Sequence, residues 1–177
     1  MNRAVLTTLT VVSAFCLQLP LAIDQAAAQQ KQQVSFKSLA ANTKYTQQTA
    51  VDVGDVPGHQ VRVFELHRAY PGDAPMVAGL KLTEMWTRGI TDFTDGTGSS
   101  TTYSVYVMEN GDKFFSRTTL VAQSLGSGKF TTTAAGPILG GTGKLAGIGG
   151  MVRTNGTAQP TAGVNDNETN IEYWIAK

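Results

Sequence analysis

Side chains that could do chemistry are concentrated in two neighbouring stretches of the sequence. Glu65 and His67 are two residues apart in a segment rich in strand-forming residues. Residues at i and i+2 of a strand point to the same face, and a carboxylate beside an imidazole can exchange a proton with it. The spacing therefore predicts a proton-transfer pair, and a hydrogen-bonded or solvent-facing histidine is the alternative interpretation.

A second group has the residue types of a small-molecule pocket. Glu84, Trp86 and Arg88 alternate along one stretch, and aromatic and basic residues follow at Tyr103 and Arg117. An aromatic wall with a few charged groups suits a small amphiphile, and an arginine suits a carboxylate. A filled core with a solvated Arg117 is the alternative. The predicted ligand-binding residues are Glu65, His67, Glu84, Trp86, Tyr103 and Arg117.

Several classes of chemistry find no support in the sequence. There is no G-x-S-x-G nucleophile motif, and the single cysteine, Cys16, lies near the N-terminus. The only imidazole besides His67 is His59, so a metal site has no third ligand that the sequence can assign. The formal net charge of +1 disfavours nucleic acid as a partner. We therefore assign no catalytic residue and predict no metal, no cofactor and no nucleic-acid partner.

The N-terminus has the layout of a secretory signal peptide. Arg3 precedes an apolar run that ends in Ala26-Ala27-Ala28. Cleavage near Ala28 would leave a secreted or periplasmic protein without a stable membrane span. Residues 29–50 have little hydrophobic patterning, so they are predicted to be a flexible arm. The remaining residues, 51–177, are predicted to form one β domain.

The composition after the signal indicates an all-β fold. The chain has 19 glycines, and short turn-like links separate its alternating stretches. Asn110-Gly111 predicts a hairpin turn with positive φ at both residues. Regular spacing favours an antiparallel meander closed into an eight-stranded up-and-down β-barrel, with a two-sheet sandwich as the alternative. Strands are expected near residues 61–70, 76–94, 101–109, 113–123, 129–135, 146–154 and 169–175.

The segment 136–150 contains a glycine block that carries a family resemblance. Its sequence, GPILGGTGKLAGIGG, resembles a signature of the allene oxide cyclase and dirigent-like β-barrel group, and looks closest to uncharacterised exported bacterial members. The resemblance implies an eight-stranded lipocalin-like barrel with a cavity, and Gly140, Gly141, Gly143 and Gly147 are interpreted as a structural turn. No helical pattern follows the block, so a phosphate-binding loop is disfavoured.

The sequence is compatible with two functions from different classes. The first is an exported barrel that binds a small apolar or amphipathic molecule without catalysis. The second is an isomerase or cyclase of the allene oxide cyclase type, which would act by holding a flexible substrate in one conformation. Assembly of copies into a homo-oligomer through the outer strand faces is a further alternative. The sequence favours the binding protein.

Overall fold

The computed structural model describes residues 30–159 and 162–176, and in this part the protein is all-β. The predicted signal peptide, residues 1–28, lies outside the described residues. None of the helices in the described part is long and apolar enough to cross a membrane. The elements are β1 (Gln32–Ser38), η1 (Ala40–Asn42), β2 (Thr43–Asp52), β3 (His59–Ala69), β4 (Met76–Val77), β5 (Leu80–Thr94), β6 (Thr97–Met108), β7 (Lys113–Gly126), β8 (Lys129–Gly141), η2 (Gly143–Leu145), β9 (Ile148–Gln159) and β10 (Val164–Ile175).

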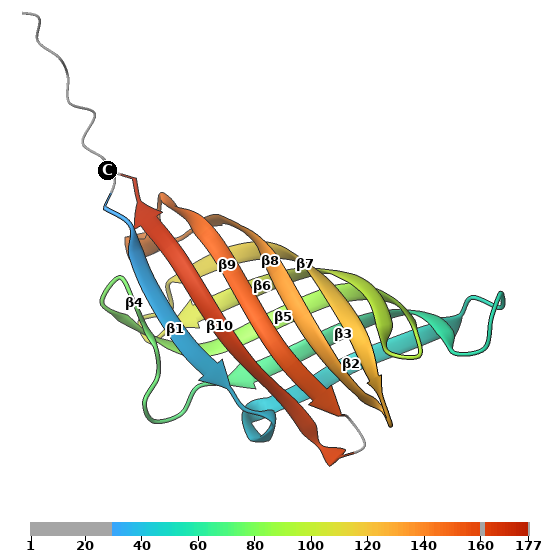
Figure 1. Ribbon diagram of the computed structural model, residues 1–177. Coiled ribbons are helices and arrows are strands. Elements are labelled where there is room, and N and C mark those ends of the chain that lie inside the picture. Colours follow the sequence, from blue (N-terminus) through green and yellow to red (C-terminus); the bar gives the residue numbers. More distant parts are fainter. Residues whose placement is uncertain (1–29, 160–161, 177) are drawn as a thin grey trace, which may run out of the picture.

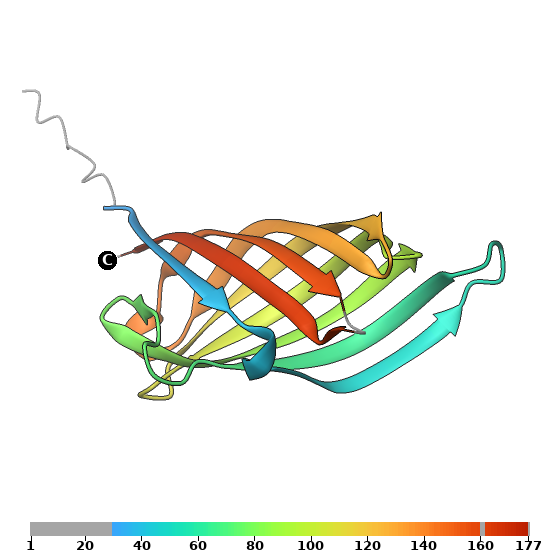
Figure 2. The same ribbon diagram turned by 60° about the horizontal axis from the view of Figure 1, so that its bottom comes forward.

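The strands form one antiparallel sheet that is rolled but not closed by strand pairing. Its order is β1-β10-β9-β8-β7-β6-β5-β3-β2, and the short β4 pairs with β5 outside this path. Figures 1 and 2 show the roll, with the β2–β3 hairpin and the β1–β10 pair on its two sides. The expectation of an antiparallel meander is confirmed. The expected closed eight-stranded barrel is not what the structure shows, because the sheet has ten strands and ends at β1 and β2.

The predicted flexible arm, residues 29–50, differs most from expectation, because its described part forms strands β1 and β2. β1 pairs with β10 along its whole length, and β2 pairs with β3. Val34 and Phe36 alternate on the inward side of β1 and pack against the core, while Ser38 is buried. Three inward residues on a short edge strand are too weak a pattern to recognise in a polar segment. The strand is stable because β10 supplies its hydrogen-bond partners.

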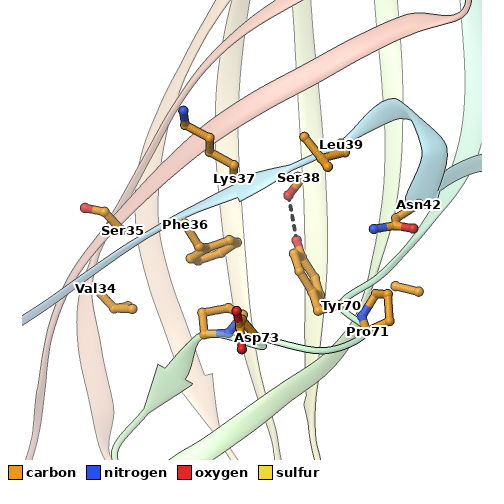
Figure 3. Close-up of a pocket in the computed structure, with 12 residues that line it drawn as sticks. Val34, Ser35, Phe36, Lys37, Ser38, Leu39, Asn42, Tyr70, Pro71 and Asp73 are labelled. Atoms are coloured by element: carbon orange, nitrogen blue, oxygen red, sulfur yellow. Dashed lines mark hydrogen bonds between the residues drawn. The ribbon is translucent and has the colours of Figure 1, made fainter.

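Side chains connect β1 and β10 to β3 and to the loop that follows β3. The Phe36 ring meets the Tyr70 ring edge-on at a centroid distance of 5.4 Å, and the Ser38 and Tyr70 hydroxyls are 2.9 Å apart. Figure 3 shows this contact, where β1 crosses the loop that follows β3 and borders a pocket of about 510 Å³. On β3 itself, Arg68 donates to Asn165 of β10. The roll is thus held together by packing and side-chain bonds where strand pairing stops.

The apolar core fills one end of the rolled sheet. Its buried members come from β4 to β10 and include Leu82, Met108, Phe114, Leu145 and Ile171. The centre of the cluster is a cross-strand pair, Tyr106 of β6 and Phe114 of β7, whose rings stack 4.1 Å apart with an interplanar angle of 4°. Burial raises the pKa of the Tyr106 hydroxyl above its usual value. Many inward side chains at the other end are serine or threonine, and together with several aromatic rings they surround an unfilled space.

The predicted turns lie beside one another at the core end. Asn110-Gly111 connects β6 to β7, but only Gly111 has positive φ, at 85°. The Asn110 side chain instead stabilises the turn, because its Oδ1 accepts the Asp112 backbone N–H and its Nδ2 donates to the Asp112 carboxylate. The same carboxylate accepts the Lys144 backbone N–H at 2.9 Å. Asp112 therefore joins this turn to the glycine block.

The glycine block forms the connection between β8 and β9. Gly140 and Gly141 end β8, Gly143 opens η2, and Gly147 directly precedes β9. Gly143 has φ of +53°, and a Cβ there would overlap the Asp112 carboxylate. Glycine is needed at this position because the backbone is left-handed and lies against another turn.

Candidate functional site

The candidate site is a hollow of about 680 Å³ inside the roll, next to the apolar core. One face of the sheet lines it, with side chains from β2, β3 and β5 to β10. Its principal lining residues are Tyr45, Arg62, Phe64, Leu66, Arg68, Met85, Thr87, Thr91, Phe93, Ser100, Thr102, Ser104, Tyr106, Thr118, Leu120, Phe130, Thr132, Thr154, Asn165, Asn167 and Thr169.

Hydroxyl groups cover much of this wall, and several satisfy one another across strands. The Thr102 and Thr118 hydroxyl oxygens are 2.7 Å apart, those of Thr87 and Ser104 are 2.9 Å apart, and those of Thr154 and Thr169 are 3.1 Å apart. Paired hydroxyls leave methyl and methylene groups facing the interior, at little desolvation cost. The wall is therefore weakly polar and can accept either apolar or polar parts of a ligand.

Aromatic rings line the hollow away from the core. Phe93 and Phe130 meet edge-on with centroids 6.4 Å apart, and Tyr45 and Phe64 meet edge-on at 5.7 Å. Gly89 makes room for Phe64, because a Cβ at Gly89 would lie 2.8 Å from the Phe64 ring. These rings supply apolar surface that a bound molecule could cover.

The charged side chains of the hollow are two arginines and one carboxylate. Arg62 and Arg68 both line it, while Asp95 is the only carboxylate among its described lining residues. The Arg62 guanidinium lies 5.9 Å from the centroids of both Tyr45 and Phe64, and donates to Gln48. Arg68 donates to Thr43 and Asn165. Neither arginine has a carboxylate within salt-bridge distance in the part of the chain that the structure describes.

None of the six predicted ligand-binding residues lines the hollow. The lining positions of β3 are even-numbered, such as Phe64, Leu66 and Arg68, so Glu65 and His67 point to the outer face. The same alternation places the other four outside, because the lining positions are odd on β5 and even on β6 and β7. The outward-facing predicted residues on these three strands are Glu84, Trp86, Tyr103 and Arg117.

The structure does bring the predicted residues together, as a cluster on the outer face. Glu65, Arg88, Tyr103 and Arg117 are successive cross-strand neighbours from β3 to β7. Arg88 is 2.7 Å from Glu65, and the Arg117 guanidinium lies 5.6 Å from the Tyr103 ring centroid. Opposite charges and cation–π contacts at strand-pair spacing satisfy one another. We interpret this cluster as stabilising the outside of the sheet.

His67 also pairs across strands rather than along its own strand. Its Nε2 lies 2.8 Å from Glu84 Oε2, and its ring lies over Trp86 with centroids 4.3 Å apart. The predicted Glu65–His67 pair is therefore wrong, since Glu65 contacts Arg88 instead. Arg88 lies directly opposite Glu65, and Glu84 is the diagonal cross-strand neighbour of His67, within reach of these long side chains.

The two arginines of the hollow are the residues that sequence reasoning missed. Arg62 and Arg68 lie in the same stretch as Glu65 and His67, on the other face. That stretch mixes apolar and charged residues on both faces, so its pattern does not show which face is inside. The alternation on β6 could have identified the inner face. Ser100, Thr102 and Ser104 lie on the same face of this strand as Tyr106 and Met108, which are large core residues.

A histidine between two carboxylates ties the β2–β3 hairpin to β5. His59 Nδ1 lies 2.7 Å from Asp55 Oδ1, and His59 Nε2 lies 2.7 Å from Asp92 Oδ1. Both ring nitrogens face acceptors, so the imidazolium, which donates from both, is the favoured form. The hydrogen bond to Asp92 is the largest cause that raises the pKa of His59 above its usual value, and the hydrogen bond to Asp55 is the next.

The raised pKa of His59 predicts a loss of stability with increasing pH. Its stabilising effect is fully present below the unfolded-state pKa and is lost as the pH rises through the higher folded-state pKa. Urea unfolding at about pH 5.5 and about pH 8.5 should therefore show a larger pH-dependent loss for the wild type than for His59→Gln. An NMR titration that gives His59 a pKa at or below 6.5 would contradict this interpretation.

Comparisons with known proteins do not assign this chain to a family. No family model matches the chain, and neither the curated proteins nor the solved structures contain a significant match to it. In the described ranges, no group of three or more histidine, cysteine, aspartate or glutamate residues is arranged to hold a metal ion. The hollow is therefore the structural feature that bears most directly on function.

Proposed function

We propose that this protein is an exported binding protein that holds a small apolar or amphipathic molecule in the hollow. The observation that carries the proposal is a space of about 680 Å³ on the inner side of the sheet, beside a filled core. Pockets for small ligands occupy about 300–1,000 Å³. The signal-like N-terminus supports export, because its basic start, apolar run and alanine-rich end are those of a secretory leader.

The chemistry of the wall supports an amphipathic ligand. Aromatic and aliphatic side chains such as Phe64, Leu66 and Met85 offer apolar contact, while hydroxyls and two arginines offer polar contact. Apolar surface supplies affinity and a few polar groups determine orientation. A molecule with both parts matches the wall better than a wholly polar one.

The cyclase alternative suggested by the allene oxide cyclase resemblance receives less support from the wall. The described lining residues include no histidine, cysteine or glutamate, and their single carboxylate belongs to Asp95. A cyclase built here would act by conformational control alone. Binding requires no further group, so we favour it.

Filling the hollow tests the proposed function. Thr132 lines the hollow, whereas its neighbour Thr133 is exposed on the outer face. We expect the neutral fluorescent probe N-phenyl-1-naphthylamine to bind the wild type with Kd of about 1–10 µM. Thr132→Trp should weaken this binding about tenfold or more, because the indole would occupy the space.

The matched control is Thr133→Trp, which should bind the probe as the wild type does. Circular dichroism of both variants checks that the sheet is retained. Absence of probe binding to the wild type, or equal binding by both variants, would overturn the proposal. Native mass spectrometry of the protein secreted by an expression host would report a copurified ligand and the number of subunits.

A further inference from the structure

We propose that Arg68 is the headgroup site of the hollow and that it binds the carboxylate of an amphipathic ligand. This inference rests on the proposed function, because it assigns the chemical class of the molecule that the hollow would hold. Its basis is the position of Arg68, in the hollow wall where its side chain reaches from β3 across the interior of the roll to Asn165 of β10.

Arg68 is a half-buried cation that has no carboxylate partner among the described residues. Its Nε donates to Thr43 Oγ1 at 3.2 Å and its Nη2 donates to Asn165 Oδ1 at 3.3 Å, both neutral acceptors. Burial is the main cause that lowers the pKa of its guanidinium, which nevertheless stays charged. Among the described residues no carboxylate lies within 4.0 Å of it. Desolvation of this charge is therefore not compensated by an ion pair within the described chain.

The guanidinium retains donors for a ligand. It has five N–H groups, and the two hydrogen bonds above use two of them. The remaining three are enough for a bidentate contact with a carboxylate, which matches the planar fork of arginine. By contrast, Arg88 on the outer face already has a carboxylate partner, which is Glu65.

The neighbourhood of Arg68 indicates a single negative charge joined to an apolar body. Met85 is its cross-strand neighbour, and Leu66 lies two residues away on the same face; both line the hollow. The other arginine, Arg62, is six residues along the strand, which corresponds to about 20 Å. A multiply charged headgroup would thus meet one guanidinium at a time, whereas a carboxylate needs only one.

The test compares two probes that share a dodecyl chain. We expect dodecanoate to bind the wild type about tenfold or more tightly than dodecanol at about pH 7.5, by isothermal titration calorimetry. In Arg68→Met this preference should fall to about twofold or less, while dodecanol still binds. Arg117→Met removes the same charge from the outer face and should leave the preference unchanged.

The possible results separate this inference from the proposed function. If neither probe binds the wild type, the proposed function fails. If both bind equally, or if Arg68→Met keeps the preference, binding in the hollow stands and the headgroup site is overturned. Because Arg68→Met also removes the hydrogen bond to Asn165, circular dichroism checks that the variant is folded. The Arg68 Nε–H resonance of the wild type provides a second measurement, which should shift with dodecanoate and not with dodecanol.

Discussion

Replacing Phe114 by alanine is expected to lower the free energy of unfolding by about 3–5 kcal/mol. The Phe114 side chain is 0% exposed and stacks face to face on Tyr106 in the centre of the core. Removing the ring leaves a cavity that neighbouring strands cannot close, because their backbones are held by ladder hydrogen bonds on both sides. Tyr106 also loses its stacking partner.

Urea denaturation followed by circular dichroism measures this effect. The matched control is Leu139→Ala, because Leu139 is 55% exposed and its loss should change stability by no more than about 0.5 kcal/mol. A loss below about 1 kcal/mol for Phe114→Ala would show that the stacked pair is not the centre of the core.

Adding one methyl group at Gly136 is expected to cost about 3 kcal/mol, the upper end of the range for overpacking. Gly136 of β8 is buried beside β7, between the paired positions Thr119–Ala135 and Ser116–Ile138. A Cβ there would overlap the Arg117 carbonyl oxygen and lie 2.8 Å from Thr118 Cα. Both neighbours are backbone atoms that cannot rotate away, so β7 and β8 would have to separate.

Hydrogen exchange locates the damage from Gly136→Ala, because amides of β7 and β8 should lose protection before those of β3 and β5. The control is Gly72→Ala, which has φ of +74° but open space around the added Cβ. It should cost only the backbone strain, about 1–2 kcal/mol. An effect of Gly136→Ala no larger than that of Gly72→Ala would contradict the steric explanation.

Local patterns predicted the strands from β3 onward well, but they did not predict β1 and β2. From residue 59 onward, alternation and glycine-containing turns placed strands where β3 to β10 lie. β1 and β2 were missed because their stability comes from partners that are distant in sequence, such as Tyr173 opposite Gln32. Propensity within the segment carries no information about such a partner.

The candidate site was predicted by residue type but not by location. Glu65, His67 and Arg117 do gather with the other predicted residues, yet the cluster is on the outer face. The inner face instead presents Arg62 and Arg68 from the same strand as Glu65 and His67. Every strand has two faces, and a one-residue offset exchanges them.

The all-β class, the antiparallel pairing of successive strands and the turns at Asn110-Gly111 and the glycine block can be inferred from the residues alone. These features depend on period-two alternation and on turn residues that act within a few positions. The folded chain was needed to show that ten strands roll without closing, which face lines the hollow, and that Arg68 has no described carboxylate partner. Those outcomes depend on long-range packing, which selects the inner face by burying Tyr106 and Phe114 together.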